Sequence, residues 1–426
     1  MPINLHEQAK LAIQNKLSEN LKYISVKHGM LLQHVSVFLA AYEANDCLPT
    51  GRIYNQLVDY VDDLPLIEFV TEFLRKELNE NIDYAKDEAD AKSLVEVQGY
   101  SDPDQVSGRI VSQLDSLPWE YTISLSLPEK LLSLSILTDG PVEFTNGRIR
   151  NVDLLMNQHF PLTHPNPRIE RIGEAGLMSL FPNSKPAWES SLYLQQEEKG
   201  FIGLYGGGSV MDRVTRRLES FLGLGLSMKL FSYHYRYENE QPACKWIVHQ
   251  KIGDTWQFST RFELEDEIPE VLKHLTAFRF EPAYPEHDRP RWLQSAVRRI
   301  GDVLKSDSSK TLELAAKWFF DSFKGNDDTL KYIRMMTALE ILLGEHADVS
   351  KASLGDILGN RLAYMIGKSH SDRADILKNF KRIYGVRSAI LHHGKHKLRG
   401  DERTYISTLR KFCERAIDEE ARLILA

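Results

Sequence analysis

The sequence predicts an α+β protein of several domains, in which helical regions at both ends flank a mixed region with antiparallel strands. Three observations lead to this fold class. Apolar residues recur at helical spacing near both ends of the chain, a period of two takes over in the middle, and no internal repeat is visible. The chain has 426 residues, of which 42% are hydrophobic, enough for about two or three domains with full cores.

The first part of the chain, residues 1–105, is expected to be mostly helical. Helical spacing of apolar residues runs from Leu5 to about Leu78 and predicts two to four helices. Residues 87–108 are rich in Asp, Gly and Ser, which is typical of an irregular connection. We therefore place the end of this region inside that segment.

Residues 106–290 are expected to form a mixed α+β domain. The stretch 119–128, WEYTISLSLP, alternates like a strand. Residues 231–264 contain three strand-like runs, broken by the turn signals NEQP and IGD, which predict an antiparallel meander.

Residues 291–426 are expected to form an all-helical bundle without any strand from about residue 300 onward. Five segments carry helical periodicity, and short connections separate them.

Charge is distributed unevenly along the chain, whose net charge is −7. Residues 77–96 hold seven acidic residues against two lysines, whereas residues 378–411 hold ten lysines and arginines against two acidic residues. The basic window would attract phosphate groups, although a charge run is as often only a solvated face.

Several classes of protein are disfavoured by composition. No window approaches the roughly 18 apolar residues of a membrane-spanning helix, and the N-terminus lacks the apolar core of a signal peptide. Cys47, Cys244 and Cys413 lie far apart, so we expect reduced, structural cysteines rather than a zinc site or disulfides. The expected location is the cytoplasm, with no membrane contact.

A glycine cluster, Gly206 to Gly208, lies between an apolar segment and a helical one. Phosphate-binding loops share this layout, because glycines let backbone N–H groups approach an anion at a helix N-terminus. There is no following Lys-Ser/Thr and no spaced GxGxxG, while Ser209 with Asp212 would suit an ordinary helix cap. We favour the turn and cap over the phosphate site.

The stretch YGVRSAILHHGKHK, residues 384–397, carries the chemistry that the sequence suggests most strongly. Gly394 would end a helix and place His392 and His393 in its last turn. An imidazole exchanges protons near neutral pH, and the guanidinium of Arg387 can hold a phosphate oxygen. A zinc site using His392 and His396 is disfavoured, because Gly394 would separate them.

Together, these two groups suit cleavage of RNA, which supplies its own nucleophile in the ribose 2′-hydroxyl. One proton must be removed and another delivered, so the reaction needs two proton-transfer groups, whereas one chain supplies one histidine. A two-fold homodimer would supply the second copy.

The span from about 311 to 425 resembles the Apea-like branch of the HEPN superfamily of helical domains. TALEILLG around Glu340, LGNRLAYMIG and KRIYGVRSAILHHGK carry the resemblance. Tyr384, Arg387, Ser388, Ile390 and His392 match the branch's Tyr-x-x-Arg-Ser-x-Ile-x-His-Gly pattern. His393 stands where many members have glycine. The family's R-x(4-6)-H motif falls on Arg387 and His392.

The resemblance implies a metal-independent endoribonuclease without a cofactor, often a regulated toxin or phage-defence effector. Arg387 and His392 would be catalytic. Residues 1–290 would sense a trigger or restrain the nuclease, and a regulatory partner is possible. The residues expected to contact the RNA substrate are Ser388, His393, Lys395, Lys397 and Arg399.

Two further points stay open. Some members of the superfamily are non-catalytic binding or dimerisation modules, and that alternative applies here too. Glu340 is expected to be a surface or salt-bridged carboxylate rather than a catalytic group, and Tyr384 a packing residue.

Overall fold

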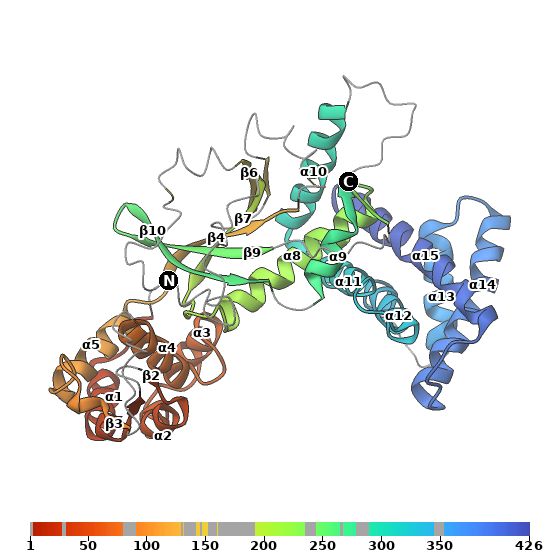
Figure 1. Ribbon diagram of the computed structural model, residues 1–426. Helices are drawn as coiled ribbons and strands as arrows, with labels where there is room; N and C mark the ends of the chain where they lie inside the picture. Colours follow the sequence, from red (N-terminus) through yellow and green to blue (C-terminus); the bar gives the residue numbers. More distant parts are fainter. Residues whose placement is uncertain are drawn as a thin grey trace.

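The computed structural model describes residues 3–27, 31–79, 91–128, 131, 142–144, 147–151, 160, 192–234, 244–264, 267–277, 289–344 and 353–426. This part of the chain is mostly helical, with antiparallel sheets in the middle and a helical region at the C-terminal end. Figure 1 shows the N-terminal helices at one end of the molecule, the main sheet in the middle and the C-terminal helices at the other end.

The described residues of the N-terminal part form five α-helices and a small three-stranded sheet with the order β2-β1-β3. Its helices surround a hydrophobic cluster that includes Ile13, Leu57, Phe69 and Ile110. The elements are α1 (Glu7–Asn20), β1 (Ser25–Lys27), β2 (Leu31–Leu32), α2 (His34–Asn45), α3 (Arg52–Tyr60), α4 (Pro65–Asn79), β3 (Lys92–Ser93) and α5 (Pro103–Asp115). The four helices α1 to α4 confirm the expected count of two to four before Leu78.

Helix α5 lies partly in the segment 87–108 that was expected to be irregular, and from residue 103 onward that expectation is wrong. Asp102 caps the helix, because its side chain accepts hydrogen bonds from the N–H groups of Asp104 and Gln105, each at 3.1 Å. Pro103 occupies the first turn, where its missing N–H has no cost. This local start signal outweighs the polar composition of the segment.

Among the residues that the structure describes, the main sheet has six strands in the order β10-β9-β4-β7-β6-β5, all neighbours being antiparallel. The expected strand at 119–128 is confirmed as β4, which lies between β7 and β9. Its last six residues are all buried, so both faces of the strand are covered although its sequence alternates. The strands are β4 (Trp119–Ser126), β5 (Val142–Phe144), β6 (Gly147–Asn151), β7 (Leu192–Gly200), β9 (Lys245–Ile252) and β10 (Thr255–Glu263).

The expected three-stranded meander over residues 231–264 is only partly correct. Strands β9 and β10 form a hairpin whose turn contains Gly253 at a φ of 59°, as the IGD signal predicts. The first run forms the short strand β8 (Phe231–Tyr233), which pairs with β11 (Leu275–Ala277) in a separate sheet. The NEQP signal lies outside the described residues. A period of two in the sequence predicts that a segment is a strand, but it does not predict which strand pairs with it.

Helix α8 (Ser209–Ser227) lies between the main sheet and α11 (Figure 1), and one hydrophobic core runs from the sheet into the C-terminal helices. A Cβ at Gly223 would collide with the carbonyl of Ala316, so glycine permits the close crossing of α8 and α11. The remaining helices are α9 (Ile268–Lys273), α10 (Arg289–Lys305), α11 (Lys310–Asp321), α12 (Asp328–Gly344), α13 (Leu354–Ile366), α14 (His370–His392) and α15 (Gly400–Ile424).

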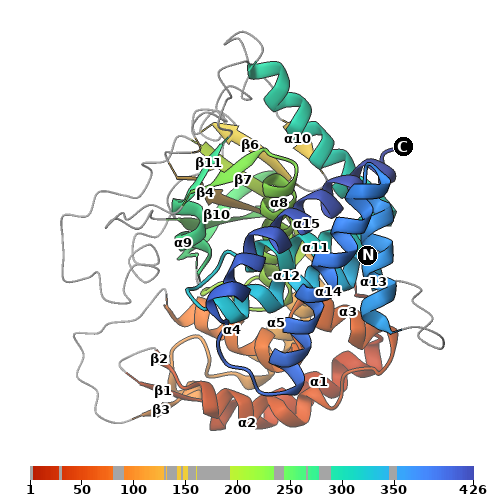
Figure 2. The ribbon, with the colours of Figure 1, turned by 90° about the vertical axis from the view of Figure 1, so that its right-hand side faces the viewer.

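The expectation of a strand-free C-terminal region is confirmed for the described residues from 300 onward, which contain helices only. Figure 2 shows these helices on the near side of the molecule. In the ranges given above, no helix is long and apolar enough to cross a membrane.

Candidate functional site

Helix α14 carries the arginine and the histidine of the predicted site. Ser369 caps its start by accepting a hydrogen bond from the N–H of Asp372 at 3.1 Å. The helix is held in the bundle by a buried face and by the hydroxyl of Tyr332, which donates to the carbonyl of Ile383 at 2.9 Å. The buried residues of this face are Ile376, Phe380, Ile383 and Val386.

The expected helix end at Gly394 is confirmed. His392 is the last helical residue, His393 is the cap, and Gly394 has a φ of 64°, which glycine adopts without strain. The N–H groups of His393 and Lys395 both donate to the carbonyl of Ala389, at 3.1 and 3.4 Å. Both histidines are exposed to solvent at the carbonyl end of the helix.

Arg387 forms a bidentate ion pair with Glu340 of α12. The Nε atom lies 2.8 Å from Oε1, and Nη2 lies 2.8 Å from Oε2. Both side chains are partly buried, with 18% and 21% exposed, so solvent screens the pair less than it screens a surface pair. The guanidinium also lies 5.6 Å from the ring centroid of Tyr384.

The structure places Arg387 and His392 on one continuous helix but does not join them by a described contact. Five residues along a helix correspond to a rotation of roughly 140°, so the two side chains leave the axis in different directions. A phosphate held by the arginine of one chain is therefore not necessarily within reach of the histidine of that chain.

The other predicted substrate-binding residues fall into two groups. Lys395 is partly buried and pairs with Glu402, whose second oxygen accepts the backbone N–H of Arg399 at 2.7 Å. Burial by itself would raise the pKa of Glu402, but Lys395 and the Arg399 N–H hold that pKa below its ordinary value. Lys395 thus fixes the start of α15.

The second group is more open to solvent. Ser388 is half-buried on α14, whereas the side chains that are exposed beyond the helix end are His393, Lys397 and Arg399. The loop that carries them is tied to α12, because the hydroxyl of Thr329 donates to the carbonyl of His396 at 3.3 Å.

The glycine loop before α8 lies against the N-terminal helices. The N–H groups of Phe201, Leu204 and Ser209 donate to the Tyr60 carbonyl, the Glu72 carboxylate and the Val61 carbonyl, at 2.8, 2.8 and 2.9 Å. This loop therefore bridges α3 and α4 to the start of α8.

Gly206 and Gly208 of this loop have no room for a side chain. Gly206 has a φ of 75°, and a Cβ there would collide with the ring of Phe262; a Cβ at Gly208 would lie 2.6 Å from the carbonyl oxygen of Val61. The glycines thus permit tight packing, as the turn interpretation expects. The expected cap by Ser209 is wrong: Gly208 is the cap residue, and the hydroxyl of Ser209 donates to the carbonyl of Val58 at 2.8 Å.

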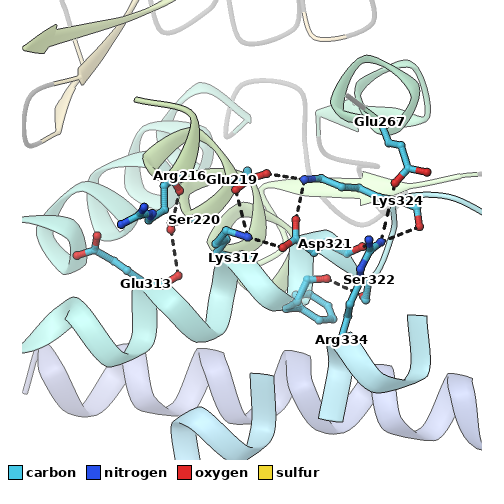
Figure 3. A network of polar contacts seen from close by, with 11 residues as sticks. Arg216, Glu219, Ser220, Glu267, Glu313, Lys317, Asp321, Ser322, Lys324 and Arg334 are labelled. Atoms are coloured by element: carbon cyan, nitrogen blue, oxygen red, sulfur yellow. Dashed lines mark hydrogen bonds and ion pairs between the residues drawn. The ribbon is translucent and has the colours of Figure 1, made fainter. Parts of the chain in front are cut away.

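A buried network of charges links α8 to α11, and sequence reasoning missed it (Figure 3). Lys324 lies 2.5 Å from Glu219 and 2.7 Å from Asp321, and Lys317 lies 2.5 Å from Asp321 and 3.5 Å from Glu219. At most 9% of the Glu219, Asp321 and Lys324 side chains is exposed. The local signal is the presence of charged residues beside large apolar ones in two segments: Glu219 in LESFLGLGL, and Lys317, Asp321 and Lys324 in AAKWFFDSFK.

Among the described residues, no three His, Cys, Asp or Glu side chains are placed to share a metal ion. A scan of protein-family models found no match to the chain, and searches of curated proteins and of solved structures found no match either. The HEPN resemblance therefore continues to rest on the motif residues around Arg387 and His392.

Proposed function

We propose that the chain is a metal-independent endoribonuclease of the HEPN type, with Arg387 and His392 as its catalytic residues. The observation that carries the proposal is the fixed guanidinium on the same helix that ends in an exposed histidine. The proposal treats residues 311–425 as the HEPN-like domain of a multidomain protein. A role as a regulated toxin or phage-defence effector is part of the proposal.

Glu340 positions Arg387 without using up its donors. A guanidinium has five N–H groups; Nη2 donates one hydrogen bond to Glu340, and Nε lies 2.8 Å from the other carboxylate oxygen as an ion pair. Three N–H groups stay available for the oxygens of a scissile phosphate. Because Glu340 fixes the plane of the fork, less conformational entropy is lost when the phosphate binds.

The proposed reaction is an attack of the ribose 2′-hydroxyl on the adjacent phosphorus. A histidine removes the proton of the 2′-hydroxyl, the new P–O bond forms, and the bond to the 5′-oxygen breaks. A second group protonates that 5′-oxygen, and Arg387 stabilises the negative charge that develops on the phosphorane. The products are a 2′,3′-cyclic phosphate and a 5′-hydroxyl.

Two proton transfers favour a homodimer in which each chain supplies one His392 to a shared cleft. The N-terminal helices have a hydrophobic cluster of their own, which suits a separate sensing or regulatory role.

A second candidate function is a non-catalytic HEPN-like module that binds RNA or a partner. The ion pair between Arg387 and Glu340 favours it, because the carboxylate neutralises the charge that would stabilise a phosphorane. Lys395 is neutralised in the same way by Glu402.

The test is cleavage of a single-stranded RNA by the full chain in EDTA, with DNA of the same sequence as the first control. We expect RNA to be cut and DNA to stay intact, because DNA lacks the 2′-hydroxyl. Arg387→Ala should lower the rate by about 10²-fold or more. Arg382→Ala removes an exposed arginine from the same helix and should retain activity. Retained binding without cleavage by the wild type would support the module instead.

A further inference from the structure

A cavity of about 630 Å³ lies where the N-terminal helices, the main sheet and the C-terminal helices meet. Its walls come from Val61 and Asp62 before α4, α4 itself, Phe201 with the glycine loop 203–208, the N-terminal half of α8, Trp246 of β9, the end of β10 and one residue of α11. Its volume is in the range of small-molecule sites, which commonly lie between structural units. It shares no residue with the Arg387 and His392 region.

The lining of this cavity is acidic. It contains two basic side chains, Arg216 and Lys317, against six acidic ones: Asp62, Glu68, Glu72, Asp212, Glu219 and Glu263. Glu72 is paired with Arg75, and Glu219 is paired with Lys317 and Lys324. Across the described ranges, no ion pair with lysine or arginine is found for the other four: Asp62, Glu68, Asp212 and Glu263.

Aromatic side chains form the rest of the wall. Phe201, Tyr205, Trp246 and Phe262 all line the cavity, and 54% of the Tyr205 surface is exposed. The guanidinium of Arg75 lies 5.3 Å from the centroid of the Tyr205 ring, so this ring already accepts a cation on its face. Aromatic faces combined with carboxylates are the usual means of recognising organic cations.

The arrangement of the carboxylates narrows the class of ligand. They are spread around the cavity, and no three acidic, His or Cys side chains of the described residues gather closely enough to hold one metal ion. A phosphate would meet an excess of negative charge. Several separated carboxylates with apolar surface between them suit an extended cation with several charges and an aliphatic chain.

We propose that this cavity binds an aliphatic polyamine, with ammonium groups at the unpaired carboxylates and methylene segments against the aromatic walls. Glu68 lies on α4 and Glu263 on β10, so a polyamine that pairs with both carboxylates links the N-terminal helices to the main sheet. Burial raises the pKa of Glu68; Asp62 and Glu72 add to that rise, whereas His34 and Arg75 oppose it. An ammonium group would relieve this unfavourable burial of charge.

Isothermal titration calorimetry of the full chain with spermidine tests the proposal directly. We expect saturable binding at one site, and Glu68→Gln and Glu263→Gln should each weaken it by about tenfold, the effect of losing roughly 1.4 kcal/mol. Glu19→Gln, at an exposed carboxylate of α1, is the matched control and should bind like the wild type. Spermidine should also raise the melting temperature of the wild type, because it binds only the folded state.

Three results would overturn the proposal. The first is no binding at millimolar spermidine, and the second is binding that neither cavity variant weakens. The third is displacement of spermidine by an equal concentration of Mg²⁺, which would indicate a diffuse counter-ion effect of the acidic wall. Circular dichroism of both variants checks that they fold. None of these readouts uses RNA cleavage, so the result is independent of the ribonuclease proposal.

Discussion

The Arg387–Glu340 pair and the buried network around Lys324 are both ion pairs between helices, but they differ in how completely their charges are satisfied. In the network, Glu219, Asp321 and Lys324 are almost fully buried, and each has an oppositely charged partner. Arg387 keeps donors that Glu340 does not engage, at the edge of a helix that ends in solvent. Buried charges that each have an oppositely charged partner serve stability and packing specificity, whereas a cation near solvent that keeps free donors can still take a ligand.

The largest expected effect on stability belongs to the network. Lys324→Met would leave Glu219 and Asp321 buried with Lys317 as their only lysine, and we expect a loss of about 3–5 kcal/mol in the free energy of unfolding. Urea denaturation at neutral pH measures it. Lys16→Met removes an exposed lysine that pairs with Glu43 and should cost less than about 1 kcal/mol.

The pH dependence of the same variant sharpens the comparison. Burial would lower the pKa of Lys324, but the carboxylates of Asp321 and Glu219 raise it above its ordinary value. The contribution of the Lys324 charge to the free energy of unfolding is therefore complete below the pKa of an unfolded lysine, about 10.4. It is lost as the pH rises through the raised pKa of the folded state. The wild type and Lys324→Met should differ least in strongly alkaline solution. Equal stabilities at neutral pH would contradict the network's assigned role.

The glycine loop gives the next largest effect. Gly206→Ala would force a side chain onto the Phe262 ring at a positive φ, and we expect a loss of about 1–3 kcal/mol in stability. Gly207 has no heavy atom within 4 Å of an added Cβ and no positive φ, so Gly207→Ala is the matched control. Thermal denaturation compares the two. A neutral Gly206→Ala would show that the loop packs less tightly than described.

A smaller effect separates the two lysines beyond the end of α14. Lys397→Ala should weaken RNA binding without changing stability. It should also reduce the slope of the binding constant against salt concentration by the amount expected for about one phosphate contact. Lys395→Ala should instead lower stability, because it removes the partner of Glu402 at the start of α15. Binding titrations at several salt concentrations test both. If RNA binding by Lys397→Ala and by the wild type depends equally on salt concentration, the RNA does not contact Lys397.

The sequence was most informative where the cause of a structure is local. Helical periodicity predicted the N-terminal and C-terminal helices, and the helix end at Gly394 followed from the backbone freedom of glycine. The pairing of β8 with β11 was missed, because strand partners depend on contacts between segments far apart in sequence. Helix α5 was missed because the polar composition of residues 87–108 indicated a loop, although Asp102 followed by Pro103 is a typical helix start.

The candidate site shows the same limit. Arg387 and His392 were selected within one short window, whereas the Glu340 contact joins residues 47 positions apart. The acidic cavity takes its walls from residues spread between Val61 and Lys317, and no short window of the sequence contains both. Charge windows predicted a basic C-terminal segment, but folding pairs some of those charges, including Lys395, with carboxylates.

The measurement that tests the central claim most directly is RNA cleavage in EDTA by His392→Ala and His393→Ala, side by side with the wild type. Both histidines are exposed at the end of one helix, so both variants should fold, and light scattering should show the same assembly. We predict that His392→Ala loses at least about 10²-fold in rate and that His393→Ala stays close to the wild type. Wild-type cleavage by both variants would contradict the ribonuclease assignment.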